Sequence, residues 1–226
     1  GTPSSSSSSL PSATPSPPSS PPSPYHSLPK HSVRIVEGEM SWGEIVENIQ
    51  EERFELFGRL EKDALYYHNS SVKIKEEWLT VSDYILYREF KLPTYIDEET
   101  KKKYCKAQDD YEAIQVERSR ERWGGVFEVE KEGEKEKVFY SFHENDYSYA
   151  LVSPISHCLL WSLPRLLTEE ERQHVVEREL GLKESDYLTF ENPPSLRSIP
   201  QIFHYQIFTK ERVVLGEEKE KEKKEN

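Results

Sequence analysis

The chain has 226 residues, a formal net charge of −12 and a hydrophobic content of 35%, below the roughly 45–50% of ordinary globular domains. An acidic chain without a basic stripe argues against nucleic acid and against anionic membrane surfaces as partners. No apolar run reaches the about 18 residues that would indicate a membrane span. These properties predict one ordinary domain with polar tails.

Two tails flank the expected domain. Residues 1–32 are rich in serine and proline, and nine of the fifteen prolines lie between Gly1 and Lys30. Such a composition buries too little apolar surface to offset the entropy of ordering, so we expect a disordered arm. Residues 216–226 are nearly all glutamate and lysine and predict a solvated tail. The globular domain is expected over residues 33–215.

Cysteine usage and the N-terminal sequence bear on location. Cys105 and Cys158 show neither CxxC spacing nor a disulfide framework, which favours a reduced, intracellular protein. The N-terminus lacks the charged-then-apolar pattern of a signal peptide, although Gly1 in place of Met leaves a removed leader open. We expect a cytoplasmic location, with the nucleus as a second compartment, and no cofactor.

Three helices are predicted in the first part of the domain. Ser41 and Glu44 form a capping-box pattern that indicates the start of a first helix. A second amphipathic helix is expected over residues 54–65, where apolar side chains recur at helical spacing. A third helix is expected over residues 82–90, with Thr80 or Ser82 as its cap and Pro93 ending it.

The middle of the chain is predicted to pass from helix to hairpin. Residues 97–122 are highly charged with a sparse apolar face, which favours a mostly helical segment ending at Gly124. Apolar and polar residues then alternate over residues 126–130 and 137–142. This pattern predicts a β-hairpin, with a charged loop over residues 131–136.

The last part of the chain predicts three strands and one helix. Strands are expected over residues 157–162, 187–191 and 203–209, and a capped helix over residues 168–180. The element order is helices, hairpin, strand, helix, strand, strand. It indicates an α+β fold in which an N-terminal helical layer packs on a mainly antiparallel sheet.

Polar side chains embedded in these apolar runs form the candidate site. They are His157, Asn192, His204, Gln206, Asn145 and Asp146. Each also has a purely structural interpretation, as a hydrogen-bonded strand residue or as an Asx-turn or cap. His157 and His204 lack a third ligand at convincing spacing, so we do not expect zinc. The functional interpretation requires His157, Asn192 and His204 to meet in one cleft.

Several short motifs follow one another in a distinctive order, over residues 145–150, 157–161, 188–192, 196–199 and 204–207. The chain resembles a largely fungal family of unknown function that includes the N-acetylglucosamine-induced proteins. Departures from the family motifs fall at Tyr147, Ser148, Ala150 and Gln206. The resemblance implies a small-molecule binding or regulatory module related to amino sugars or nucleotide sugars.

A more distant resemblance concerns the final strand. His204-Tyr-Gln206 resembles the last two positions of the His-x-His-x-Gln motif of the histidine-triad nucleotidylyltransferases, with Ile202 in place of the first His. It implies that His204 attacks an α-phosphate and that Gln206 holds a phosphoryl oxygen. A third hypothesis is a scaffold that acts through the Ser/Pro arm. The sequence leaves binding and turnover both open and indicates no particular protein partner.

Overall fold

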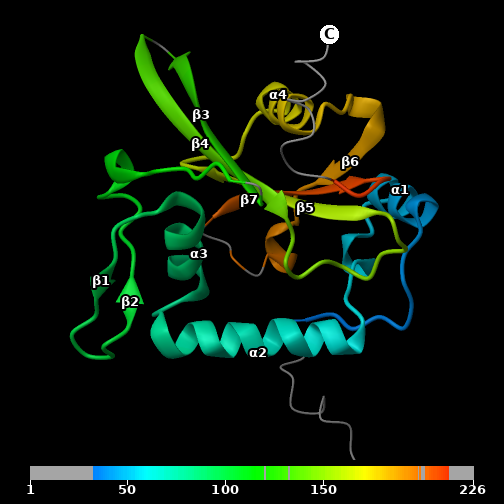
Figure 1. The fold of residues 1–226 in the computed structure, drawn as a ribbon, viewed down its shortest axis with the longest axis horizontal. Coiled ribbons are helices and arrows are strands. Elements are labelled where there is room, and N and C mark those ends of the chain that lie inside the picture. Colours follow the sequence, from blue (N-terminus) through cyan, green and yellow to red (C-terminus); the bar gives the residue numbers. More distant parts are fainter. Residues whose placement is uncertain (1–32, 120, 132, 198, 200–201, 214–226) are drawn as a thin grey trace, which may run out of the picture.

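The protein is described by a computed structural model that covers residues 33–119, 121–131, 133–197, 199 and 202–213 (Figure 1). The predicted arm over residues 1–32 and the predicted tail over residues 216–226 lie outside these described residues. The scaffold hypothesis depends on that arm and therefore stays a prediction.

A five-stranded antiparallel sheet forms the centre of the fold. Its order is β3-β4-β5-β7-β6, and each neighbouring pair is antiparallel. The strands are β3 (Arg122–Lys131), β4 (Glu134–Glu144), β5 (Ser156–Leu163), β6 (Tyr187–Phe190) and β7 (Phe203–Thr209). The predicted α+β class and its mainly antiparallel sheet are confirmed.

Helices cover both faces of this sheet (Figure 1). One face carries α1 (Trp42–Gln50), α2 (Glu61–Glu77) and α3 (Val81–Phe90), and the other carries α4 (Glu169–Leu180). Because side chains alternate along a strand, β7 sends Tyr205 and Ile207 into the core under α4 and Phe208 into the core beside α1. We call the face toward α1, α2 and α3 the inner face.

Local capping signals place three of the helices. Ser41 and Glu44 form a reciprocal capping box at the start of α1, and Thr80 accepts a hydrogen bond from the backbone of Asp83 at the start of α3. In α4, Thr168 caps the first turn and Gly181 ends the helix with φ of 67°, a conformation that favours glycine. The predicted capped starts of α1 and α4 and the predicted ends of α3 and α4 are confirmed, and α3 begins at Val81, one residue before the prediction.

The second helix differs from its prediction over residues 54–65. Residues Phe54–Leu56 form a single 3-10 turn, and α2 begins only at Glu61 and continues to Glu77. The chain is extended around Gly58, because Arg59 forms a parallel bridge with Ile35 through hydrogen bonds to the backbone of Arg34 and Val36. Glycine permits this close approach, since a Cβ there would lie 2.6 Å from Val36 Cγ1. This contact keeps the chain before Glu61 out of the helix, so α2 begins later than predicted. No glycine or proline interrupts α2 before Glu77, so the helix also continues further than predicted.

The mostly helical prediction for residues 97–122 is wrong. The segment contains the end of a short hairpin, β1 (Tyr95–Ile96) and β2 (Lys103–Tyr104), followed by a 3-10 turn at Tyr111–Ala113. An Asx-type turn starts the hairpin connection, since the backbone N–H of Thr100 donates to Asp97 Oδ1 at 2.7 Å. Gly124 ends no helix but lies in β3.

The predicted hairpin is longer than expected. Its strands, β3 and β4, pair from Arg122 opposite His143 to Lys131 opposite Glu134. Position 125 of this strand requires glycine, because the Tyr140 ring lies across the backbone there. A Cβ at this position would lie 2.3 Å from the Tyr140 hydroxyl oxygen. The extra length brings Arg122 and His143 to the inner face as neighbours.

Candidate functional site

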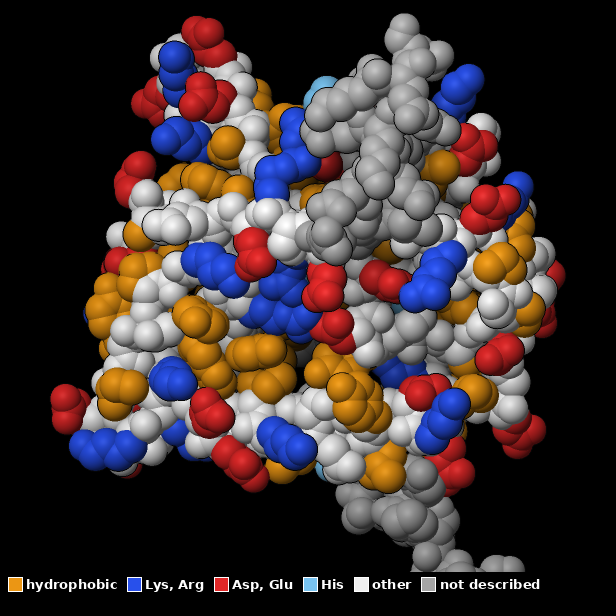
Figure 2. All heavy atoms as spheres, viewed as in Figure 1, with side chains coloured by type: hydrophobic (Ala, Val, Ile, Leu, Met, Phe, Trp, Pro, Cys, Tyr) orange, Lys and Arg blue, Asp and Glu red, His pale blue; other side chains and the backbone are white. Residues whose placement is uncertain are grey.

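A cavity of about 930 Å³ lies between the inner face and the helices α2 and α3. We call it the central cavity. Its floor is set by strand register: Leu159 of β5 lies between His143 of β4 and Gln206 of β7, and Trp161 lies beside His204. Figure 2, which views the molecule from the same side as Figure 1, shows basic and acidic side chains side by side at the middle of the visible surface, near hydrophobic side chains and a hollow.

His204 forms part of the cavity wall. Its Nδ1 lies 3.3 Å from the carbonyl oxygen of Ile202. A carbonyl can only accept, so Nδ1 carries the proton and the neutral ring keeps its lone pair on Nε2. The ring packs on Trp161 with 4.4 Å between centroids. Burial lowers the pKa of His204 to about 4, which keeps the imidazole neutral near pH 7.

His157 is sealed behind that wall. Its Nε2 donates to Gln206 Oε1 at 2.6 Å, and its Nδ1 accepts from the backbone N–H of Tyr149 at 3.2 Å. The ring is stacked between Tyr149 and Phe208, with 4.7 Å between centroids on each side. Burial lowers its pKa to about 3. His157 therefore uses both nitrogens to hold Gln206 and the Tyr149 backbone, while Gln206 itself lines the cavity.

The loop after β4 supplies two further predicted residues. Asn145 Oδ1 accepts from the backbone N–H of Tyr147 at 2.9 Å, the Asx-turn geometry that was its structural interpretation. Asp146 forms an ion pair with Arg88 of α3. Asn192 approaches from the loop after β6, with Nδ2 3.5 Å from the Tyr149 hydroxyl. Asn145, Asp146 and Asn192 all line the central cavity.

A family model described as a protein of unknown function, DUF3605, matches residues 41–210. The chain belongs to the DUF3605 family. No curated protein matches the chain by sequence. A solved structure described as the crystal structure of HTC1 shares 14% identity over 81% of this chain and 91% of that chain, with a TM-score of 0.44. A likeness at this level bears on neither ligand nor reaction.

Two features of this DUF3605 cavity were missing from the predicted site. The first is Arg59, which the sequence places on the edge of the second predicted helix and which also matches a Leu-x-x-Arg motif of the resembling family. Its Nε donates to the carbonyl oxygen of Tyr147 at 2.9 Å, and its guanidinium lies 4.5 Å from the Tyr67 ring centroid and 5.3 Å from that of Tyr149. Among the described residues, no carboxylate lies within ion-pair distance of Arg59. The cation is thus held in the cavity wall by aromatic rings.

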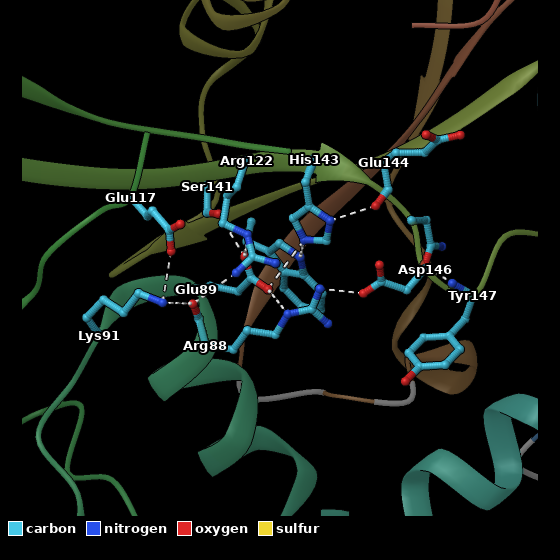
Figure 3. Close-up of polar contacts among 12 residues, drawn as sticks. Arg88, Glu89, Lys91, Glu117, Arg122, Ser141, His143, Glu144, Asp146 and Tyr147 are labelled. Atoms are coloured by element: carbon cyan, nitrogen blue, oxygen red, sulfur yellow. Dashed lines mark hydrogen bonds and ion pairs between the residues drawn. The ribbon is translucent and has the colours of Figure 1, made fainter. Parts of the chain in front are cut away.

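The second missed feature is Glu89 of α3, whose side chain is fully buried. Figure 3 shows it meeting side chains from three elements. Ser141 donates to Oε2 at 2.7 Å. His143 Nε2 lies 3.3 Å from Oε1, and the Nε atoms of Arg88 and Arg122 each lie 3.5 Å from a carboxylate oxygen. Burial alone would raise the pKa of Glu89, but these hydrogen bonds and charges outweigh it and the pKa is lowered.

This Glu89 cluster lies where two cavities of the DUF3605 chain meet. A smaller cavity of about 490 Å³ shares Arg88, His143 and Asp146 with the central cavity. The available sequence signal was the position of Glu89, four residues after Ile85 and next to Phe90, on a helical face whose apolar residues are buried. A carboxylate at such a position needs partners that only the tertiary structure supplies.

Within the described ranges, no helix combines the length and the apolar character needed to cross a membrane. Across the same residues, no cluster of three or more His, Cys, Asp or Glu has a metal-binding arrangement.

Proposed function

We propose that this DUF3605 protein is a binding or regulatory module for a small molecule of the amino-sugar or nucleotide-sugar class. The observation that carries the proposal is the floor of the central cavity. There Leu159 and Trp161 form an apolar strip, with His143 on one side and Gln206 and His204 on the other. Small-molecule sites combine an apolar lining with a few placed polar groups in this way.

The dimensions of this floor suit a sugar ring. Neighbouring strands lie about 4.8 Å apart, so His143 and Gln206, two strands apart, are separated by roughly 10 Å. A pyranose ring has an apolar face and a rim of hydroxyl groups. It can lie on Leu159 and Trp161 with its rim toward the polar residues. The resemblance to N-acetylglucosamine-induced proteins supports the amino-sugar class.

The first test is isothermal titration calorimetry with N-acetylglucosamine, UDP-N-acetylglucosamine and UMP. We expect at least one sugar to bind, and Gln206→Leu to weaken its binding about 5- to 13-fold, since a buried hydrogen bond is worth roughly 1–1.5 kcal/mol. Tyr205→Phe is the matched control, because Tyr205 lies on the same strand but donates to the Leu167 carbonyl oxygen on the α4 side. Equal losses in both variants, or no binding by any sugar, would refute the proposed module.

A second candidate function, nucleotidyl transfer through His204, has one observation in its favour. The Ile202 carbonyl fixes the proton on Nδ1 and leaves the Nε2 lone pair available at the cavity wall. Nε2 would attack the α-phosphorus of a nucleotide sugar, forming a P–N bond as the P–O bond to the sugar phosphate breaks. Incubation with a UDP-sugar that is radiolabelled on the α-phosphate should then give a labelled protein, which His204→Ala does not give. The absence of label in the wild type removes this candidate.

A further inference from the structure

Arg59 forms no ion pair within the described part of the chain, although Asp63 lies near enough to interact with its charge. Two other arginines that line the central cavity, Arg88 and Arg197, form ion pairs with Asp146 and Glu191. For Arg59 no such carboxylate is present among the described residues, and neither Nη atom donates to a described acceptor. Arg59 is half-buried, and this partial burial lowers its pKa, because the cation loses part of its hydration.

The guanidinium is nevertheless firmly positioned. The backbone of Arg59 bridges to residues 34–36, with its N–H donating to the Arg34 carbonyl oxygen at 2.9 Å. Its Nε donates to the Tyr147 carbonyl oxygen, and the rings of Tyr67 and Tyr149 lie close to the guanidinium. These contacts involve the Nε–H of Arg59 and the planar faces of its guanidinium group. The two Nη atoms remain for a ligand, in the fork that matches oxyanions.

We propose that Arg59 is the anion-recognition residue of the central cavity and that the ligand carries a phosphoryl group. This inference rests on the proposed function and narrows it from amino sugars in general to sugar phosphates and nucleotide sugars. The phosphoryl oxygens accept from the Nη atoms of Arg59, near Tyr149 and Asn192. The sugar ring extends from there over Leu159 and Trp161. An anion in this position also offsets the cost of burying the arginine charge.

The wild-type protein gives the first test. Calorimetry at one ionic strength compares N-acetylglucosamine, N-acetylglucosamine 6-phosphate, UDP-N-acetylglucosamine and inorganic phosphate. Hydrogen bonds to charged groups contribute about 1.5–3 kcal/mol, so we expect a phosphorylated sugar to bind roughly 10- to 150-fold more tightly than N-acetylglucosamine. Equal affinity for the phosphorylated and unphosphorylated sugars overturns the inference.

Substitution then locates the effect. Arg59→Gln should remove most of the preference for the phosphorylated sugar while changing the affinity for N-acetylglucosamine less than about twofold, and Arg59→Lys should keep part of it because the charge remains. Arg53→Gln is the control: Arg53 pairs with Glu47 and Glu51 and does not line the cavity. If Arg59→Gln fails to fold by circular dichroism, Arg59→Lys and the wild-type comparison decide the matter.

The outcomes separate the two proposals. Binding of N-acetylglucosamine with no gain from the phosphoryl group leaves the sugar module standing and overturns the role of Arg59. Binding of inorganic phosphate that depends on Arg59, without binding of any sugar, supports the anion site and overturns the sugar class. No binding by any of the four compounds overturns both.

Discussion

At the scale of single residues, Glu89 is the side chain whose environment departs furthest from expectation. A carboxylate with no exposed surface keeps its charge only if nearby donors replace the water it has lost. Ser141 donates a hydrogen bond to Glu89, and the Arg88 and Arg122 cations each lie 3.5 Å from one of its oxygens. His143 Nε2 lies 3.3 Å from Oε1 but accepts from Trp161 Nε1, and Oε1 has no hydrogen-bond partner among the described residues. The cluster joins α3 to β3 and β4, so Glu89 holds the helix that forms one wall of the central cavity.

We predict that Glu89→Gln lowers the free energy of unfolding by about 3 kcal/mol, the lower end for breaking a buried ion pair. Arg122 would lose its charge partner, while Arg88 would keep Asp146. Urea unfolding followed by tryptophan fluorescence measures the change. Glu144→Gln is the control, since Glu144 is exposed and surface substitutions usually stay within about 0.5 kcal/mol. A similar small change for Glu89→Gln would show that the cluster contributes little.

His157 illustrates a different role for a polar residue in an apolar strand. It was expected either to share a ligand or to act as a structural hydrogen bonder. With one nitrogen on Gln206 and the other on the Tyr149 backbone, it has the contacts of a structural residue. It orients the Gln206 amide oxygen away from the cavity and toward itself. The Gln206 nitrogen is therefore the part of that amide most available to a ligand.

At the scale of elements, prediction succeeded where the signal is local. The capping residues of α1 and α4 lie within four positions of the helix start, and the backbone N–H they satisfy belongs to the same turn. The alternation along β7 likewise assigns His204, Gln206 and Phe208 to one face without knowledge of any partner strand. The inner face of the site was therefore accessible from sequence.

Prediction from sequence failed in the two segments whose backbone structure is determined by contacts with residues distant in the chain. The helical pattern over residues 54–65 competes with the close passage of Gly58 against Val36, and this contact between two segments determines where α2 begins. The charged segment over residues 97–122 has helical composition, yet the short hairpin and a backbone bond from Gln115 to the Phe90 carbonyl oxygen keep it irregular. Propensity is a weak prior that tertiary contacts override.

The same distinction explains the candidate site. Strand patterns indicated that His204, Gln206 and the loop residues Asn145, Asp146 and Asn192 share a region, and the structure places all five on the central cavity. Arg59 and Glu89 reach it from helical or extended segments packed over the sheet. Whether these two side chains reach the cavity depends on how the N-terminal helical layer packs on the sheet. The periodicity of the sequence does not encode this packing. Buried charges within apolar segments are nevertheless a signal worth following.

At the scale of the whole molecule, pH acts on two opposing properties. The chain carries a formal net charge of −12 at pH 7, and protonation at lower pH reduces this self-repulsion, which favours the compact state. The buried histidines act in the other direction. His157 and His204 are neutral in the folded protein, with pKa values lowered by burial to about 3 and about 4. In the unfolded chain they titrate near pH 6.5.

Because their folded pKa values are depressed, the stability that these histidines contribute is complete above about pH 6.5 and is lost as the pH falls below it. Between pH 7.5 and pH 5 the unfolded chain takes up two more protons than the folded protein, and we predict a loss of about 4 kcal/mol in the free energy of unfolding. Urea titrations at intervals across this range measure it. Loss of net charge alone would give the opposite sign.

Replacing one buried histidine should halve this dependence. In His204→Gln the low-pH slope of unfolding free energy is expected to fall from about 2.7 to about 1.4 kcal/mol per pH unit, since one titrating group remains. His174→Gln is the matched control, because His174 is exposed and its removal should leave the slope unchanged. The slope separates titration from a general loss of packing, which would lower stability equally at every pH. An unchanged slope in His204→Gln would mean that the pKa of His204 is the same in the folded and unfolded states, so that burial does not lower it.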